Sequence, residues 1–232
     1  MVQTDILRRS QRPTDDRRKK LAVFDMDGVL TTHPSSWEFV HRYAQVSNEE
    51  ARELYEKSLI SYSDFLKSDV RLWISSGKVR THSDLVRILS GIPVTAGAVE
   101  TVESIRKMGF VTAIISGGLY DLVDLIDPQH RLFDFVFANR VAVDAGGYLV
   151  PDGQIMVEPM EKGTVLRKLQ QDLSIGAENT MSVGDSVQDI PMFRMSKISV
   201  AVGSGNSEIA GIAKYVVPRE DFRKIMRLAT EV

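Results

Sequence analysis

Two aspartates, one residue apart, stand directly after a short apolar run. The run covers residues 21–24, and Asp25, Asp27 and Gly28 follow it. Residues two apart in a strand point to the same face, and open α/β sheets bind their ligands at the carboxyl ends of their strands. Two carboxylates there cost desolvation and mutual repulsion unless a cation or hydrogen-bond donors compensate. The pair therefore indicates a Mg²⁺ site that also supplies a nucleophile, although an Asp-x-Asp-Gly turn alone is common.

Three further polar groups follow expected strands or open expected helices. Because the carboxyl ends of parallel strands lie along one edge of a sheet, these groups can converge with the aspartate pair. Each also has a plainer interpretation, as a strand-to-helix turn, a surface lysine or two acids on one helix face. Their shared order along the chain favours a common site. The groups are Ser116-Gly117-Gly118, Lys162, and Gly184-Asp185 with Asp189.

These residue types suit phosphoryl transfer. A phosphate monoester is an anion that must meet an anionic carboxylate, so the site needs positive charge and hydrogen-bond donors. Carboxylate-bound Mg²⁺ supplies part of that charge, and Lys162 supplies a further point charge. The Ser116 hydroxyl and the amides at Gly117 and Gly118 can donate to phosphate oxygens. We expect a helix to begin at this turn and to add the positive end of its dipole.

The composition excludes several other functions. The chain has 232 residues, no cysteine and a net charge of −2. Disulfides, thiolate catalysis and cysteine-bound metal are thereby excluded, and no global field favours nucleic acid or a membrane surface. No apolar run approaches the roughly 20 residues that span a bilayer, and the N-terminus has no segment of signal-peptide type. We expect a cytoplasmic protein with neither nucleic acid nor membrane as partner.

Alternating strand and helix patterns predict the elements that position these groups. The alternation is typical of an α/β fold with a Rossmann-like, doubly wound and mostly parallel sheet. Gly146-Gly147 lies between two short apolar segments and predicts a hairpin. The expected strands cover residues 21–25, 110–115, 135–138, 180–183, 198–202 and 215–217.

Helical spacing predominates directly after the first strand. Ser47 to Glu50 predicts a capping box, and Thr81 to Asp84 has the chemistry of a second helix start. We therefore predict a small helical cap over residues 32–94, an α/β core over 21–31 and 95–232, and a basic flexible tail over 1–20.

The motifs resemble those of the haloacid dehalogenase superfamily of phosphohydrolases, over about residues 21–217. The second and fourth motifs are most similar to the phosphoserine phosphatase subfamily. The four motifs are Asp25-Met26-Asp27-Gly28-Val29, Ile115-Ser116-Gly117-Gly118, Lys162-Gly163, and residues 184–193 from Gly184-Asp185 to Met192-Phe193.

The resemblance implies a role for each motif residue. Asp25 would be the nucleophile that forms an aspartyl-phosphate, and Asp27 would be the general acid and base. Mg²⁺ would be held by the Asp25 carboxylate, the Asp27 backbone carbonyl and the Asp185 carboxylate. Ser116, Gly117 and Lys162 would bind the phosphoryl group, and Asp189 would orient Lys162 or a metal-bound water.

Two departures from the subfamily concern the substrate. Its members carry a glutamate soon after the first motif and an arginine in the cap. Here the corresponding stretches hold His33-Pro34-Ser35-Ser36 and Asp69, with Arg71 two residues further on. Because an amino acid zwitterion is selected by paired charges, these departures argue against phosphoserine. His33, Arg71 and Gln188 are the candidates for substrate specificity.

The sequence therefore predicts a Mg²⁺-dependent phosphomonoester hydrolase that acts on a small phosphorylated metabolite. A phosphotransferase or mutase would use the same residues, and a non-catalytic phospholigand-binding protein is a further alternative. Mn²⁺ in place of Mg²⁺ stays open because both ions accept oxygen ligands. The oligomeric state stays open as well, a homodimer included.

Overall fold

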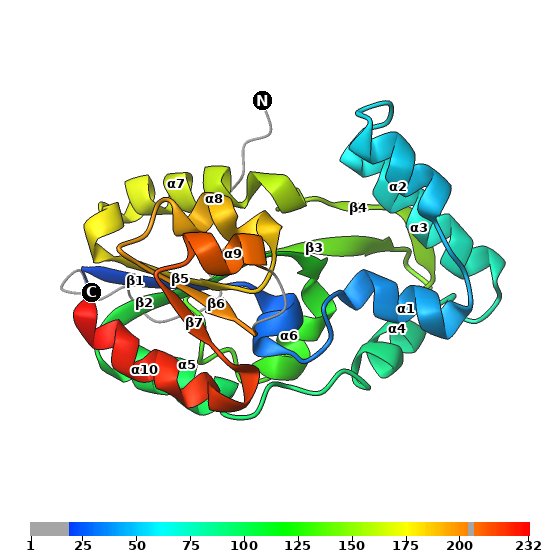
Figure 1. Ribbon diagram of the computed structural model, residues 1–232. Helices are drawn as coiled ribbons and strands as arrows, with labels where there is room; N and C mark the ends of the chain where they lie inside the picture. Colours follow the sequence, from blue (N-terminus) through cyan, green and yellow to red (C-terminus); the bar gives the residue numbers. More distant parts are fainter. Residues whose placement is uncertain (1–18, 204–206) are drawn as a thin grey trace.

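The computed structural model has a seven-stranded sheet at its centre (Figure 1). It describes residues 19–203 and 207–232, so the predicted tail over residues 1–20 lies almost wholly outside the described residues. The strand order is β4-β3-β2-β1-β5-β6-β7, and every neighbouring pair is parallel except β3 with β4. The predicted doubly wound α/β fold is confirmed. The strands are β1 (Lys20–Phe24), β2 (Phe110–Leu119), β3 (Phe135–Val143), β4 (Leu149–Gln154), β5 (Thr180–Gly184), β6 (Ile198–Val202) and β7 (Tyr215–Val217).

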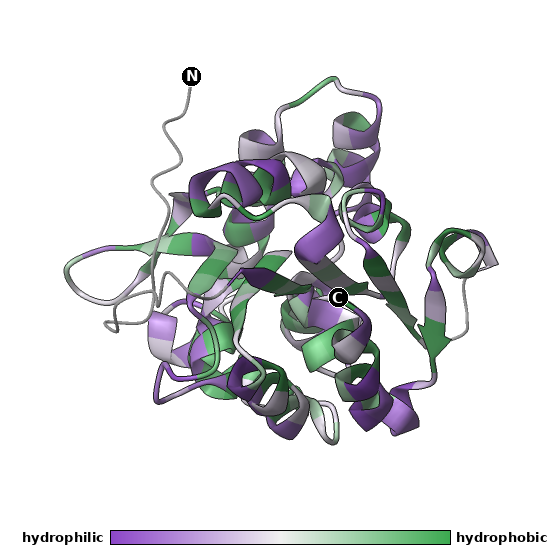
Figure 2. Ribbon diagram, turned by 90° about the vertical axis from the view of Figure 1, so that its left-hand side faces the viewer, coloured by the Kyte–Doolittle hydropathy of each residue, from purple (hydrophilic) through white to green (hydrophobic). Residues whose placement is uncertain are grey.

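Helices cover both faces of the sheet, and apolar strands lie between their more polar outer surfaces (Figure 2). The alternation of β1 shows why two layers form, since Leu21 and Val23 pack in one cluster while Ala22 and Phe24 pack in another. One layer holds α7 (Lys162–Leu173), α8 (Ile190–Phe193) and α9 (Ser207–Ile212), and the other holds α5 (Ala98–Lys107), α6 (Tyr120–Ile126) and α10 (Ile225–Leu228).

Four helices between β1 and α5 form what we call the helical insert, which lies beside one end of the sheet (Figure 1). The β3–β4 hairpin contacts the insert through two backbone hydrogen bonds. Leu149 N donates to Arg80 O and His82 N donates to Gly147 O, both at 2.9 Å. The hairpin predicted around Gly146-Gly147 is thus present. The division into core and cap at residues 32–94 stays a prediction. The insert consists of α1 (Ser36–Ala44), α2 (Glu49–Glu56), α3 (Tyr62–Ser75) and α4 (His82–Leu89).

The two predicted helix starts in the insert have different outcomes. Thr81 caps α4 as predicted, and together with Asp84 it forms a reciprocal capping box. The box predicted over Ser47 to Glu50 is wrong, because Asn48 is the N-cap of α2 and makes no side-chain cap. The Asn48 side chain instead donates to Asp69 and accepts from Ser68 on α3. A tertiary contact has replaced the local one.

Candidate active site

Asp25 stands at the carboxyl end of β1 and opens a π-helical turn, Met26–Leu30. Its Oδ1 accepts from Met26 N at 2.7 Å. The turn leaves helical geometry at Asp27 and at Gly28, which has φ of 72°. A Cβ on Gly28 would lie 1.8 Å from Asp185 Oδ2. A glycine is therefore needed both for the backbone angle and for the close approach of the two strand ends.

Lys162, the first residue of α7, lies between two carboxylates. Its Nζ is 2.8 Å from Asp25 Oδ2 and 2.7 Å from Asp189 Oδ1, and the side chain is 1% exposed. Burial alone would lower the pKa of Lys162, but the charges of Asp189 and Asp25 outweigh burial and hold that pKa above its ordinary value. A fixed ammonium therefore stands against Asp25.

Asp189 is fully buried and its two oxygens are occupied by the protein. Oδ1 accepts from Lys162, and Oδ2 accepts from Asp185 N at 2.9 Å, Ser186 N at 3.0 Å and Ser186 Oγ at 3.2 Å. These bonds tie the short 3₁₀ turn Val187–Asp189 to the end of β5. The arrangement suits orientation of Lys162 better than direct ligation of a metal.

Three carboxylates nevertheless gather here. One oxygen from each of Asp25, Asp185 and Asp189 lies within 4.8 Å of the others. Burial, reinforced by the charges of Asp25 and Asp189, raises the pKa of Asp185 to about 8. Burial likewise raises the pKa of Asp25 to about 6, although Lys162 opposes the rise. Clustered acids that resist ionisation need a further cation, and hard oxygen donors are the ligands that Mg²⁺ prefers. The residues therefore fit a divalent metal ion.

Asp27 is held by the first residue of α1. Ser36 N and Oγ donate to Asp27 Oδ2 at 2.8 and 2.7 Å, and Ser36 Oγ accepts from Leu119 N at 2.9 Å. Among the described residues no group bonds to Asp27 Oδ1, which is buried. Burial raises the pKa of Asp27, and the Ser36 hydrogen bonds oppose that rise. With its raised pKa, Asp27 holds a proton more readily than an ordinary aspartate, as a group that passes a proton to a bound ester must.

The segment from Ser116 to Gly118 stays extended inside β2. The helix predicted to follow this segment and to end at Ile126 is present as α6, but it begins at Tyr120, two residues past Gly118. Gly117 O accepts from Trp37 Nε1 and from Asn139 Nδ2, both at 3.0 Å. These two donors hold the chain extended where the β2–β3 pairing becomes irregular. The positive end of the α6 dipole therefore lies just past the segment and not within it.

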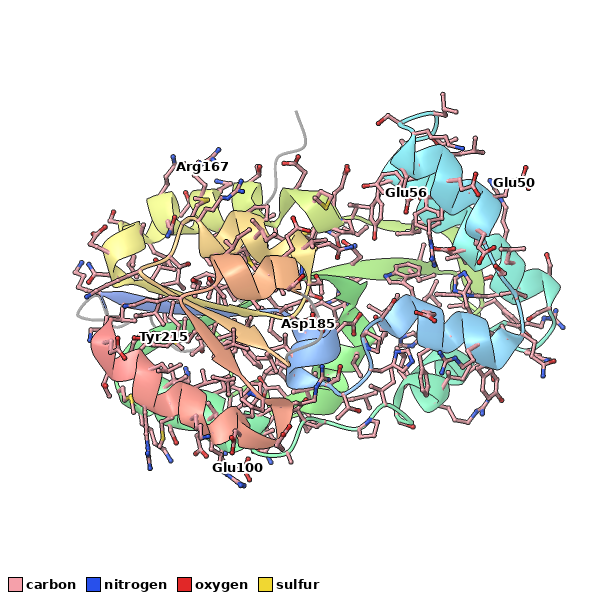
Figure 3. The ribbon with its side chains drawn as sticks, viewed as in Figure 1. Glu50, Glu56, Glu100, Arg167, Asp185 and Tyr215 are labelled. Atoms are coloured by element: carbon pink, nitrogen blue, oxygen red, sulfur yellow. The ribbon has the colours of Figure 1, made fainter. Side chains whose placement is uncertain are left out.

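The strand ends and the helical insert enclose a cavity of about 650 Å³. Figure 3 shows Asp185 beside the π-helical turn, with Glu56 on the insert. His33 and Arg71 are not on the cavity wall. His33 packs edge-on against Phe39, and Arg71 is exposed on α3. The sequence candidates on the wall are Asp25, Asp27, Ser116, Gly117, Lys162, Asp185 and Gln188.

The insert supplies polar wall residues that the sequence patterns did not single out as site residues. Asp69 is 4% exposed, and its Oδ1 accepts from His41 Nε2 at 2.9 Å and Asn48 Nδ2 at 2.6 Å. Arg52 of α2 lines the same wall. The available signal was the one-turn spacing of Trp37 and His41, which places both on one face of α1. No local sequence pattern indicates that the side chains of Asn48 and Asp69 form a hydrogen bond.

Comparison with known proteins agrees with this geometry. A model of the haloacid dehalogenase-like hydrolases matches residues 136–225. Phosphoserine phosphatase of Methanocaldococcus jannaschii is 29% identical over 214 residues, which cover 91% of this chain and 98% of the relative. The chain is thus similar to the phosphatases of the haloacid dehalogenase superfamily over most of its length. The predicted resemblance is confirmed.

Two solved superfamily structures are similar over nearly their whole length. One is a phospho-aspartyl intermediate analogue of phosphoserine phosphatase, with a TM-score of 0.71 and 26% identity. The other is a substrate-bound phosphoserine phosphatase complex, with a TM-score of 0.72 and 26% identity. Each match covers 91% of this chain and 99% of the other chain. Within the described part of this chain, no helix has the length and apolar character needed to cross a bilayer.

Proposed function

We propose that this phosphatase is a Mg²⁺-dependent hydrolase of small phosphomonoesters and that it forms an aspartyl-phosphate on Asp25. The observation that supports this proposal most directly is the ion pair between Asp25 and buried Lys162. Lys162 Nζ lies 2.8 Å from Asp25 Oδ2, inside the carboxylate cluster. The phospho-aspartyl analogue of a similar phosphatase supports the covalent route. The cytoplasmic location and the oligomeric state remain predictions.

The two aspartates divide the chemistry. An oxygen of Asp25 attacks phosphorus, the ester P–O bond breaks, and Asp27 gives its proton to the departing alkoxide. Asp27 then takes a proton from the water that attacks phosphorus, and the Asp25–phosphorus bond breaks to release inorganic phosphate. Ser36 donates twice to Oδ2 of Asp27, while the enclosed Oδ1 has no partner among the described residues.

The remaining groups stabilise the transferring phosphoryl oxygens. Lys162 adds positive charge, and the Ser116 hydroxyl and the backbone at Gly117 add hydrogen bonds. Asp189 keeps Lys162 in place. Asp25, Asp185 and the Asp27 backbone carbonyl would hold Mg²⁺, which when bound withdraws charge from the phosphoryl group.

The test is phosphate release from a panel of small phosphomonoesters, with Mg²⁺ and with excess chelator. Asp25→Asn is compared with wild type and with Asp172→Asn, a change of the same kind on the surface of α7, where Asp172 pairs with Lys168. We expect metal-dependent release to fall by at least about 10³-fold in Asp25→Asn and to be unchanged in Asp172→Asn.

Three results would contradict the proposal. Normal turnover by Asp25→Asn would show that Asp25 is not the nucleophile. Transfer of the phosphoryl group to an added alcohol, in preference to water, would favour the phosphotransferase alternative. A folded protein that binds Mg²⁺ and releases phosphate from no ester would contradict hydrolysis altogether.

A further inference from the structure

The insert end of the cavity carries a carboxylate that the phosphoryl chemistry does not use. Asp69 on α3 is 4% exposed and lies on the cavity wall. Its Oδ1 accepts from both His41 and Asn48. No described residue donates a hydrogen bond to its Oδ2. This oxygen is also not fully enclosed by the protein. One oxygen is thus fixed by the protein and the other is open to the cavity.

His41 holds Asp69 in place. Its Nε2 is 2.9 Å from Asp69 Oδ1, while its Nδ1 lies 2.8 Å from Trp37 O and accepts from Trp73 Nε1 at 3.1 Å, so the ring is fixed on both sides. Burial alone would lower the pKa of His41, but the hydrogen bond and charge of Asp69 raise that pKa above its ordinary value. Two donors therefore use Asp69 Oδ1, and Oδ2 is left as an acceptor on the cavity wall.

Two sets of contacts tie this end of the cavity to the phosphoryl end. Trp37 stands one helical turn before His41, about 6 Å along the axis, and its indole bonds to Gly117 O. Tyr62, another wall residue, accepts through its hydroxyl from Asn139 Nδ2 at 3.3 Å, and Asn139 also bonds to Gly117 O. A short metabolite with its phosphoryl group near Gly117 can therefore extend to Asp69.

The charges on the wall select the kind of group that fits. An ammonium near Asp69 would be repelled by the guanidinium of Arg52, which lines the same wall and has no ion-pair partner among the described residues. A carboxylate would meet Asp69 itself, with Glu49 and Glu56 further along the wall. A hydroxyl donates to Oδ2 without either conflict. The rings of Trp37 and Tyr62 offer faces against which the carbons of a polyol can pack.

We infer that Asp69 is the specificity-determining acceptor for a hydroxyl of a phosphorylated polyol, either a sugar phosphate or a polyalcohol phosphate. This inference rests on the proposed function, which places the phosphoryl group of the same substrate at Asp25. An ester that lacks the hydroxyl leaves Oδ2 without a donor in a buried site, so it is bound and turned over less well.

The experiment compares pairs of esters that differ in their hydroxyls. Glycerol 1-phosphate is paired with propyl phosphate, and erythritol phosphate with butyl phosphate, while phosphoethanolamine and phosphoglycolate supply the charged alternatives. In wild type we expect kcat/KM to favour each hydroxylated ester by about 10-fold or more. Asp69→Asn should remove most of this preference and leave propyl phosphate within about 2-fold of wild type. This wild-type comparison needs no variant to fold.

The matched control is Asp152→Asn. Asp152 is an exposed aspartate of β4, the strand against which α3 packs. Among the described residues, its one ion pair is a 3.9 Å contact with Lys67. This variant should keep the hydroxyl preference. A second readout is the NMR titration of His41, whose pKa should fall in Asp69→Asn and stay raised in Asp152→Asn.

Each other outcome overturns a definite claim. Faster turnover of phosphoethanolamine or phosphoglycolate than of the polyol esters contradicts the hydroxyl assignment. An equal loss on all esters in Asp69→Asn shows a structural role only. Equal rates within each pair, with release still dependent on Asp25, contradict the role of Asp69 and spare the proposed function. No metal-dependent release from any ester contradicts both.

Discussion

Asp25 and Asp27 are the same residue type, two positions apart, in different surroundings. A buried ammonium faces Asp25, whereas two neutral donors from Ser36 face one oxygen of Asp27, and the other oxygen is enclosed without a partner among the described residues. A carboxylate beside a cation suits attack on phosphorus, and a buried carboxyl with a raised pKa suits proton transfer. The surroundings, more than the motif, assign the two proposed tasks.

Replacing Asp27 tests the second task. Asp27→Asn removes the proton donor and acceptor but keeps the size of the side chain, so we expect kcat to fall by about 10²- to 10⁴-fold. Binding of Mg²⁺, followed by calorimetry, should persist because the ligand from this residue is its backbone carbonyl. Pre-steady-state measurement of phosphoenzyme formation and breakdown should show both steps slowed. Turnover at the wild-type rate is incompatible with the assignment.

Ser36 should act on the reaction through Asp27. Its hydrogen bonds favour the ionised form of Asp27, so Ser36→Ala should raise the pKa of Asp27 and move the kcat/KM–pH profile toward higher pH. The matched control is Ser35→Ala, because Ser35 caps the same helix by accepting from Glu38 N at 3.1 Å. This control should lower stability by about 1 kcal/mol without moving the profile. An unshifted profile in Ser36→Ala would show that the bond is structural only.

The elements themselves differ in how far the sequence could predict them. Helices such as α5 and α7 and the strands of the parallel sheet follow from local periodicity and caps, and their topology brings Asp25, Lys162 and Asp185 to one edge. Local signals failed where distant residues compete. The Asn48 side chain bonds to Asp69 and therefore does not cap α2. Hydrogen bonds from Asn139 and Trp37 to Gly117 O keep β2 extended past the expected helix start. The catalytic roles of the site residues stay predictions.

Asn139 offers a test of how β2 and β3 support the site. Its amide nitrogen bonds to Gly117 O and Val157 O, and its Oδ1 accepts from Met156 N and Val157 N. Asn139→Ala leaves these buried groups unpaired, so we expect a loss of about 2–3 kcal/mol in unfolding free energy and a raised KM for phosphate esters. Urea unfolding and steady-state kinetics measure the two effects.

The control for this variant is Asn179→Ala, on the 3₁₀ turn Ala177–Asn179, where the half-buried Asn179 donates through its amide to the neighbouring Glu178 side chain at 3.4 Å. It should leave both the unfolding free energy and KM nearly unchanged. If Asn139→Ala lowered stability but left KM unaltered, the hydrogen bonds to Gly117 would have no part in placing the phosphate-binding segment.

In the whole molecule, the acidic cluster opposes folding when no metal is bound. The pKa of Asp25 is raised to about 6 and that of Asp185 to about 8. The folded protein therefore binds more protons than the unfolded chain above about pH 4, and these two groups lower stability as pH rises from there to about 8. Metal-free protein should melt at a lower temperature at pH 8 than at pH 5.5, and Mg²⁺ should reverse the loss.

Asp185→Asn tests the predicted effect of the acidic cluster on stability. It removes one of the repelling charges, so the metal-free Tm at pH 8 should rise by about 2 °C or more, and the Mg²⁺-dependent increase should disappear. Asp172→Asn, far from the cluster, should keep both the pH dependence and the response to Mg²⁺. Scanning calorimetry at the two pH values provides the measurement, and a full Mg²⁺ response in Asp185→Asn would exclude this carboxylate as a ligand.

The stacking of Trp37 on Trp73 has an optical consequence. These are the chain's two tryptophans, and their rings lie 5.3 Å apart at 28°. Trp37 also bonds through its indole to Gly117 of the phosphate-binding segment. All of the protein's tryptophan emission therefore originates where the helical insert meets that segment. A ligand that tightens or breaks this contact alters the emission of the unlabelled protein, so stopped-flow fluorescence can follow the arrival of a ligand at this contact within a turnover.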